Sequence, residues 1–386
     1  MYNKRSVFIA ACIGIAFFGV AFIVMGGVLP ALTQKYDLNS IEAASLVTFL
    51  PIGILLGSLV FGPVVDRYGY RSLLIVSIAV EVAGLCGLSF FDHRTLLRFC
   101  IFLIGWGGGM LNGSTNALVA DISDDRNRSS RLSILGACYG VGALLIPVLL
   151  ASLSRRFSYE TILLGCAVIL LLSIVYFAAI RFPRPSCTQG IPVRQMFGLV
   201  RQPLILMLSL FLFFQSGLEG LFNNWTTTYL AATGTALSAE RIVFSLTFVI
   251  LGMTLMRLAL SKLLGMFPHF RILTASSLLT ILGLLLLKYA TGYGMVAIAL
   301  FCCGAGLAAG FPVIIGLIGS LYRDIPGSAI GFALFIALSG NSLLNYLIGF
   351  TTELFGIGSF PFSLIIILLL QSVILFKEKR IINTNS

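Results

Sequence analysis

The sequence predicts an all-α membrane protein with twelve transmembrane helices in two six-helix bundles. Of its 386 residues, 58% are hydrophobic and only 10% are charged, whereas roughly a quarter of the residues in a soluble domain are charged. Apolar runs of about twenty residues recur along the whole chain, and each could cross a hydrocarbon core of about 30 Å as a helix. Strands of a membrane β-barrel would alternate in polarity, so these continuous runs favour helices.

Short connections separate the predicted spans, with one exception. The spans cover about 7–29, 43–64, 72–91, 96–119, 131–151, 160–180, 204–224, 241–261, 271–289, 295–318, 328–350 and 358–376. The exception, 181–203, contains four arginines and no acidic residue: Arg181, Arg184, Arg194 and Arg201. We expect a cytoplasmic linker here, between an N-terminal bundle at 1–180 and a C-terminal bundle at 204–386.

The basic residues predict the orientation, because Lys and Arg collect in cytoplasmic loops. With the N-terminus inside, most of the 25 Lys and Arg residues fall on the cytoplasmic side. We therefore expect a multi-pass protein of the cytoplasmic (inner) membrane with both termini in the cytoplasm. The first apolar run lacks a small-residue cleavage site and is expected to be the first helix, not a signal peptide.

Several other classes of protein are disfavoured. The net charge of +11 is spread over short loops, and no clustered basic face for nucleic acid is expected. The eight cysteines show no CxxC spacing and are expected to be small buried hydrophobes, not metal ligands. No HExxH, GxSxG or P-loop pattern occurs, so neither an enzyme with catalytic residues nor a bound metal or cofactor is expected. The expected partners are a small-molecule solute and the lipid bilayer, with the protein itself monomeric.

Glycines indicate an internal repeat. Three glycines of the first half have counterparts at one constant separation along the chain: Gly53 and Gly252, Gly105 and Gly304, Gly107 and Gly306. Duplication explains this agreement, although glycine is common in membrane helices and coincidence is the alternative. Parallel repeats are a known transporter arrangement in which substrate binds near the midplane, between the halves.

The segment that joins the second and third spans has the features of a conformational latch. Gly57 would let helix backbones approach closely, and Asp66 could meet the positive N-terminal end of a neighbouring helix and pair with a basic residue. Gly69 allows a tight turn, while Arg67 and Arg71 hold the loop at the cytoplasmic surface. An ordinary positively charged loop is the alternative.

This segment resembles the signature loop of the major facilitator superfamily, GxLxxxxxDRxGRR, with Tyr70 in place of a basic residue. Looser patterns at Gly136–Pro147, Gln215–Trp225 and Gly304–Pro312 resemble the fucose permease-like group of sugar:proton symporters. The first resemblance covers the whole chain and implies the twelve-helix major facilitator fold. The second implies a proton-coupled sugar importer.

Two carboxyl groups inside predicted spans are candidates for proton coupling. A charge at mid-helix costs roughly 2.5–3.5 kcal/mol on insertion scales, so it usually faces a cavity or a partner. Burial favours the protonated form, which could release its proton when the cavity changes side. Glu219 has Gln215, Asn223 and Trp225 nearby, whereas Glu81 has no polar companion at helical spacing. Glu219 is therefore the leading candidate, with a structural hydrogen bond as the alternative.

Buried amides are costly unless they are paired, so amide pairs one turn apart should face the interior of a bundle. They could bind substrate or join helices. The candidates for substrate binding are Asn112, Asn116, Tyr139, Gln215, Asn223, Trp225, Asn341 and Asn345. Arg257, in the eighth span, either pairs with an acid across the bundle or extends to the cytoplasmic surface.

The prediction for function is a secondary transporter that moves a small polar solute, a sugar or sugar derivative, by alternating access. Its driving force is expected to be the proton gradient. The alternative is a drug or metabolite efflux transporter, a proton antiporter of the same fold. Two alternatives from other classes are a receptor that binds its ligand without transport and a membrane enzyme, although no recognisable catalytic cluster supports the enzyme.

Overall fold

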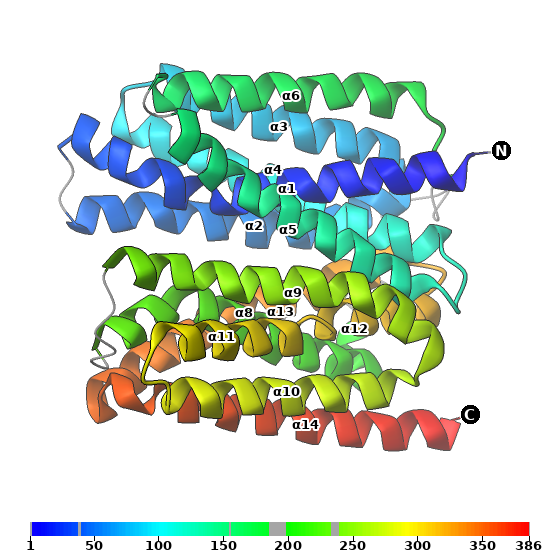
Figure 1. Ribbon diagram of the computed structural model, residues 1–386. Helices are drawn as coiled ribbons and strands as arrows, with labels where there is room; N and C mark the ends of the chain where they lie inside the picture. Colours follow the sequence, from blue (N-terminus) through cyan, green and yellow to red (C-terminus); the bar gives the residue numbers. More distant parts are fainter. Residues whose placement is uncertain (1, 38–39, 154–155, 185–197, 233–238, 386) are drawn as a thin grey trace. The chain divides into compact units, whose positions relative to one another are not determined.

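The computed structural model describes residues 2–37, 40–153, 156–184, 198–232 and 239–385. Their regular structure is entirely helical (Figure 1). In chain order the helices are α1 (Lys4–Lys35), α2 (Ser40–Tyr68), α3 (Tyr70–Phe90), α4 (Arg94–Ile122), α5 (Arg128–Leu153), α6 (Tyr159–Ala179), η1 (Leu199–Arg201), α8 (Pro203–Ala232), α9 (Ala239–Met266), α10 (His269–Lys288), α11 (Tyr293–Leu307), α12 (Gly310–Leu321), α13 (Pro326–Phe355), η2 (Ile357–Ser359) and α14 (Phe360–Asn385).

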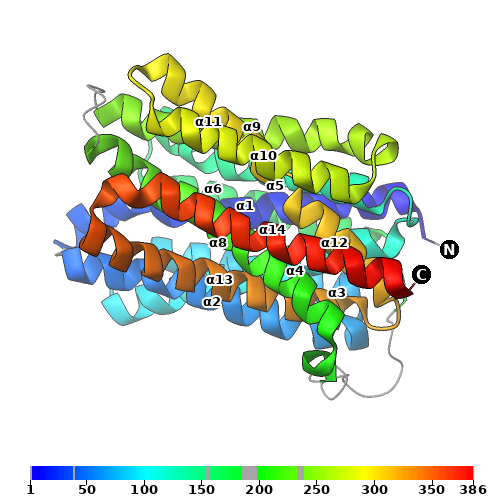
Figure 2. The ribbon, with the colours of Figure 1, turned by 90° about the horizontal axis from the view of Figure 1, so that it is seen from below.

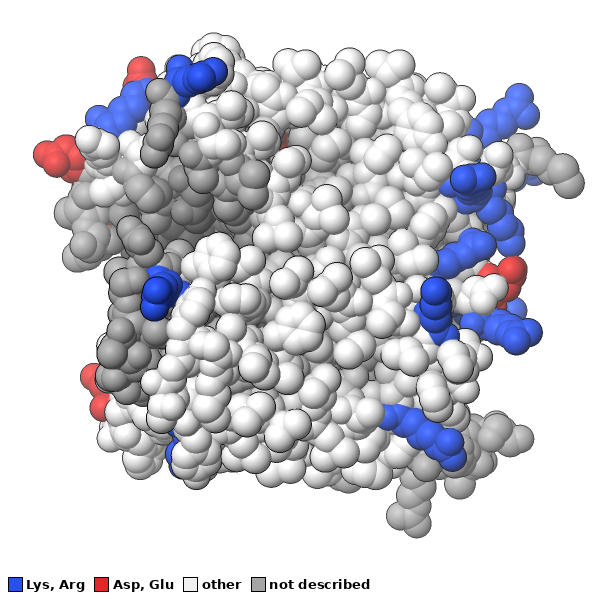
Figure 3. Space-filling model, viewed as in Figure 1, with Lys and Arg blue, Asp and Glu red and all other residues white. Residues whose placement is uncertain are grey.

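The predicted all-α membrane fold is confirmed. Within the described residues, 11 helical spans are long and apolar enough to cross a membrane, and α11 and α12 together form one of them. The 26-residue helix α5 supplies the twelfth long helical segment. Most helices continue past the predicted spans, because a hydropathy pattern ends where apolar residues end and a helix can continue beyond the hydrocarbon core. Figure 3 shows the same view as Figure 1, and most of the charged side chains that can be seen in it lie near the ends of the helices.

The tenth predicted span is not one continuous helix. α11 ends at Leu307, and α12 begins at Gly310. Pro312 lies in the first turn of α12, where its missing N–H group has no intrahelical partner to lose. At the break, the carbonyl of Leu307 accepts a hydrogen bond of 2.8 Å from Nε2 of Gln215.

The chain forms two compact units. Unit 1 comprises Met1–Ile122, Cys138–Phe197 and Tyr322–Phe335, and unit 2 comprises Ser123–Ala137, Gly198–Leu321 and Ile336–Ser386. Within unit 2, α11 packs against both α9 and α10, and these three helices lie together in Figure 2. The predicted linker stays a prediction, because 185–197, including Arg194, lies outside the described residues.

Glycine allows α2 to pack closely on α4 in unit 1, and α9 to pack closely on α11 in unit 2. A Cβ added at Gly105 would overlap the carbonyl oxygen of Leu50, and one added at Gly304 would overlap that of Val249. Leu50 and Val249 have the same separation along the chain as the two glycines. Small residues permit such close backbone approach in membrane helices.

The other repeated glycines make equivalent contacts too. At the same separation, the neighbours of each glycine in unit 1 correspond to those of its counterpart in unit 2: Gly53 faces Phe102 as Gly252 faces Phe301, and Gly107 faces Ser77 and Glu81 as Gly306 faces Ser276 and Thr280. Coincidence in glycine positions alone would not reproduce the neighbours. The internal repeat therefore relates α2–α4 to α9–α11.

We expect Gly105→Ala and Gly304→Ala to lower the unfolding midpoint in detergent, because the added methyl group would force the paired helices apart. Overpacking of this kind typically costs about 1–3 kcal/mol. Gly165→Ala on α6 is the matched control, since no atom of the described residues lies within 4 Å of its Cβ position. An unfolding midpoint for Gly105→Ala or Gly304→Ala as high as that of the control would contradict this packing.

Candidate functional site

Glu219 lies in the middle of α8 and belongs to a network of polar side chains. Its side chain is 19% exposed, and its Oε1 is 3.7 Å from Nη2 of Arg257 on α9. The same oxygen accepts a hydrogen bond of 3.0 Å from Nε2 of Gln215, one turn earlier on α8. The predicted candidates Glu219 and Gln215 are therefore in contact, and a buried arginine accompanies them.

Arg257 pairs with an acid. The sequence had left two interpretations of this side chain, pairing with an acid or extension to the cytoplasmic surface. Its side chain is only 6% exposed, and Nη1 donates a hydrogen bond of 3.1 Å to the carbonyl of Gly136. Its Nε has no hydrogen-bond partner among the described residues. A guanidinium group carries five N–H donors in a fixed fork, so Arg257 has donor capacity left for a ligand.

Two glutamines support this ion pair. Gln371 on α14 donates a hydrogen bond of 3.0 Å to Oε1 of Gln215, and this directs the amide nitrogen of Gln215 toward Glu219 and the break after α11. Sequence reasoning missed Gln371. The available signal was that Gln371 is the only amide side chain in the last predicted span.

A second polar cluster joins α8 to α13. Oδ1 of Asn345 accepts hydrogen bonds from Nε1 of Trp225 at 3.1 Å and from Nδ2 of Asn224 at 3.0 Å. Nδ2 of Asn345 donates to the carbonyl and side-chain oxygens of Asn341 at 2.8 and 2.9 Å. The structure thus brings together three predicted candidates and adds Asn224. The predicted Asn223, which precedes it on α8, is exposed, as Asn224 is.

Unit 1 holds the remaining substrate candidates. Nδ2 of Asn116 donates to the carbonyl oxygen and Oδ1 of Asn112 at 2.8 and 3.1 Å, the same arrangement as in the asparagine pair of α13. The ring of Tyr139 on α5 lies 5.4 Å from that of Phe18 and 6.3 Å from that of Phe22. Both phenylalanines were missed because the many phenylalanines of this chain cannot be told apart by sequence.

Glu81 on α3 lies in a different environment from Glu219. It is fully buried, and neither carboxyl oxygen has a hydrogen-bond partner among the described residues. The repeat puts Thr280 at the equivalent place in unit 2, where its hydroxyl donates to the carbonyl of Ser276 at 3.0 Å. An unpaired charge at such a site would be costly, so we expect Glu81 to be neutral.

The predicted latch residue Asp66 lies at the N-terminus of a helix. Its carboxylate is buried and accepts hydrogen bonds from the backbone N–H of Gly327 at 3.1 Å and of Ser328 at 2.8 Å. The hydroxyl of Ser328 adds a third bond of 2.6 Å. These donors belong to the first turn of α13, whose positive dipole end favours an anion. Control of conformation by this contact stays a prediction.

The other predicted latch residues lie within α2, at the turn that follows it and at the start of α3. Gly69 has φ 82°, in the left-handed region that favours glycine, and it separates α2 from α3. Gly57 lies so close to α4 that a Cβ would overlap the carbonyl of Trp106. Arg71 donates to the carbonyl of Ala178, and the guanidinium of Arg67 is 6.0 Å from the ring centre of Tyr68.

We expect Arg257→Met to destabilise the protein by about 3 kcal/mol, because it would leave Glu219 buried without its charge partner. The double substitution Arg257→Met/Glu219→Leu should recover most of this loss, since two apolar side chains can replace a buried ion pair. Unfolding midpoints in detergent measure both effects. A double variant as unstable as the single one would contradict the pairing.

Comparison with known proteins identifies the family. The chain matches the Major Facilitator Superfamily over residues 11–345. It is 23% identical to Bypass of stop codon protein 6 of Saccharomyces cerevisiae, over 92% of this chain and 78% of that protein. Its fold is similar to that of FucP in the outward conformation, with a TM-score of 0.80, 19% identity, and 97% of this chain and 99% of FucP covered.

The proton:xylose symporter XylE is also similar, with a TM-score of 0.80 and 14% identity over 97% of this chain and 95% of XylE. At these identities the solved structures show the fold alone, and this fold agrees with the helical architecture described above. The family match over most of the sequence decides the assignment. This chain is a membrane transporter of the Major Facilitator Superfamily, and not an enzyme.

Proposed function

We propose that this transporter imports a small polar solute, a sugar or sugar derivative, together with protons. The observation that carries the proposal is the contact of Glu219 with Arg257 and Gln215 in the interior of unit 2. Two proteins of similar fold, FucP and XylE, are described as fucose:proton and proton:xylose symporters. Their likeness in fold supports symport here without naming the solute.

Coupling follows from competition for Arg257. While Glu219 is ionised, it holds the guanidinium group of Arg257 as its charge partner. Protonation of Glu219 removes this attraction, and the N–H groups of Arg257 can then donate to a solute hydroxyl. Departure of the solute leaves these N–H groups without their acceptor and the guanidinium without a charge partner, which favours ionisation of Glu219 and release of its proton. Solute and proton would therefore bind together and leave together.

The asparagine pairs suit a solute with many hydroxyl groups. Each amide has both donors and an acceptor, as a hydroxyl does, and the half-buried pairs at Asn112 and Asn116 and at Asn341 and Asn345 retain part of this capacity. The indole of Trp225 is half-buried beside Asn345 and could cover the apolar face of a sugar ring. An efflux transporter for apolar drugs would be expected to carry fewer buried amides.

We expect Glu219→Gln to abolish solute accumulation in reconstituted vesicles under an imposed pH gradient, while exchange of labelled for unlabelled solute continues. The amide keeps the shape of the side chain but cannot carry the proton. Glu81→Gln is the matched control and should retain both activities, because its carboxyl group has no hydrogen-bond partner among the described residues. Accumulation by the Glu219 variant, or its loss in the control alone, would exclude Glu219 as the coupling residue.

A panel of sugars should include one that raises the unfolding midpoint of the purified protein, since a ligand that binds the folded state stabilises it. We expect Asn345→Ala to weaken this binding by about tenfold, the typical effect of losing a buried hydrogen-bond partner. Ser342→Ala, an exposed site on the same helix, should leave it unchanged. If no sugar stabilises the protein and cationic dye export depends on Glu219, the efflux alternative replaces the proposed import.

A further inference from the structure

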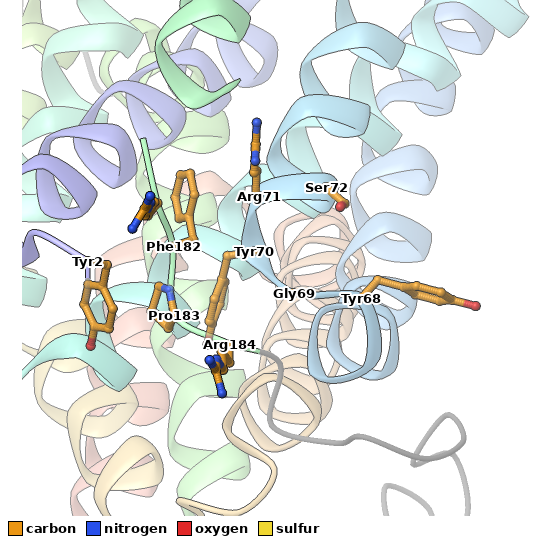
Figure 4. Close-up of a pocket in the computed structure, with 10 residues that line it drawn as sticks. Tyr2, Tyr68, Gly69, Tyr70, Arg71, Ser72, Phe182, Pro183 and Arg184 are labelled. Atoms are coloured by element: carbon orange, nitrogen blue, oxygen red, sulfur yellow. The ribbon is translucent and has the colours of Figure 1, made fainter. Parts of the chain in front are cut away.

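An open hollow of about 720 Å³ lies in unit 1, and its lining shares no residue with the polar clusters around Glu219, Asn345 and Asn112. The start of α3 and the segment after α6 form its walls (Figure 4). Among the described residues, its lining contains three arginines and no acidic residue. The lining residues are Tyr2, Tyr68, Gly69, Tyr70, Arg71, Ser72, Arg181, Phe182, Pro183 and Arg184.

The N-terminus of α3 contributes backbone donors to this hollow. α3 is 21 residues long, and Gly69 precedes it without any side-chain cap. The first N–H groups of a helix have no partner within the helix, and here they belong to Tyr70, Arg71 and Ser72, which all line the hollow. A helix N-terminus of this kind attracts anions, because unpaired N–H groups and the helix dipole act together.

A buried hydroxyl group gives a second, independent indication of a ligand. Tyr70 is only 3% exposed, and its phenol oxygen has no hydrogen-bond partner among the described residues. Figure 4 shows its ring extending from α3 toward Pro183 and Arg184. A buried hydroxyl without a partner costs free energy, so an acceptor at this wall would satisfy a group that the protein leaves unpaired.

The three arginines of the hollow differ in their contacts and exposure. Arg71 already donates to the carbonyl of Ala178, which joins the start of α3 to the end of α6. Arg181 and Arg184, on the segment that follows α6, are exposed. A guanidinium group matches the geometry of phosphate oxygens through paired N–H donors. The hollow thus combines fixed backbone donors with two accessible cationic side chains.

We propose that this hollow binds a phosphate group, with the N-terminus of α3, the hydroxyl of Tyr70, Arg181 and Arg184 as its donors. The phosphate can belong to the headgroup of an anionic lipid or to a soluble phosphate compound. Basic pockets near the membrane surface commonly bind anionic headgroups. This site is independent of the proposed solute and proton pathway, and its ligand would connect the turn beside Asp66 to the start of the segment after α6.

The test uses the purified full-length protein in an uncharged detergent at constant ionic strength. The probes are inorganic phosphate, short-chain phosphatidylglycerol and, as a zwitterionic control, short-chain phosphatidylcholine. The unfolding midpoint as a function of probe concentration gives an apparent Kd. Stabilisation by phosphatidylglycerol alone identifies a lipid headgroup, and stabilisation by phosphate as well identifies the phosphate group itself as sufficient. Equal stabilisation by phosphatidylcholine would overturn the proposal.

We expect Arg181→Gln/Arg184→Gln to raise the apparent Kd at least about tenfold, since two charge-assisted donors are removed. Arg126→Gln/Arg201→Gln is the matched control: it removes the same charge from exposed arginines outside the hollow and should change the Kd less than about twofold. An equal loss in both variants would show attraction to general surface charge and would overturn the site.

Tyr70→Phe separates binding from folding. Without ligand its unfolding midpoint should be equal to or above that of the unmodified protein, because the substitution removes a buried hydroxyl that has no partner. Its apparent Kd should nevertheless rise at least about threefold, as expected when a ligand loses one hydrogen bond. An unchanged Kd in this variant, or no stabilisation of the unmodified protein by either anionic probe, would overturn the proposal.

Discussion

The constraint on which this structure depends is that a polar group inside a bilayer must find its partner within the protein. Glu219 meets this requirement through Arg257 and Gln215, and Gln215 in turn through the carbonyl of Leu307 and the amide of Gln371. Side chains of α8, α9 and α14 and the break between α11 and α12 thereby belong to one network. A change in the charge of Glu219 would alter the hydrogen bonding of several elements of unit 2 together.

The internal repeat gives both units the same helix packing, but the polar side chains placed on this packing differ. The contacts of Gly53, Gly105 and Gly107 recur at their counterparts in unit 2, so the same helix packing is built twice. On this common packing, unit 1 places the carboxyl group of Glu81 where unit 2 places the hydroxyl of Thr280. The two units therefore share this helix packing, whereas the ionisable side chains that it carries differ between them.

Some buried polar groups do not meet the requirement for a partner within the protein. Nε of Arg257, the carboxyl of Glu81 and the hydroxyl of Tyr70 have no hydrogen-bond partner among the described residues. We propose a different role for each: a donor to solute at Arg257, a neutral acid at Glu81, and a donor to an anion at Tyr70. The first and third have a polar site beside them, and only these two enter the proposals for binding.

The sequence by itself determined the helical membrane fold, its twelve apolar segments and the glycine turn at Gly69, because hydropathy and backbone preference act over short stretches of chain. It also indicated the internal repeat and the polar neighbourhood of Glu219. Only the tertiary structure decided that Arg257 pairs with Glu219, that Gln371 orients Gln215, and that Asn224 joins Asn345. These partners lie on different helices, and a pattern within one helix cannot specify which face of another will pack against it.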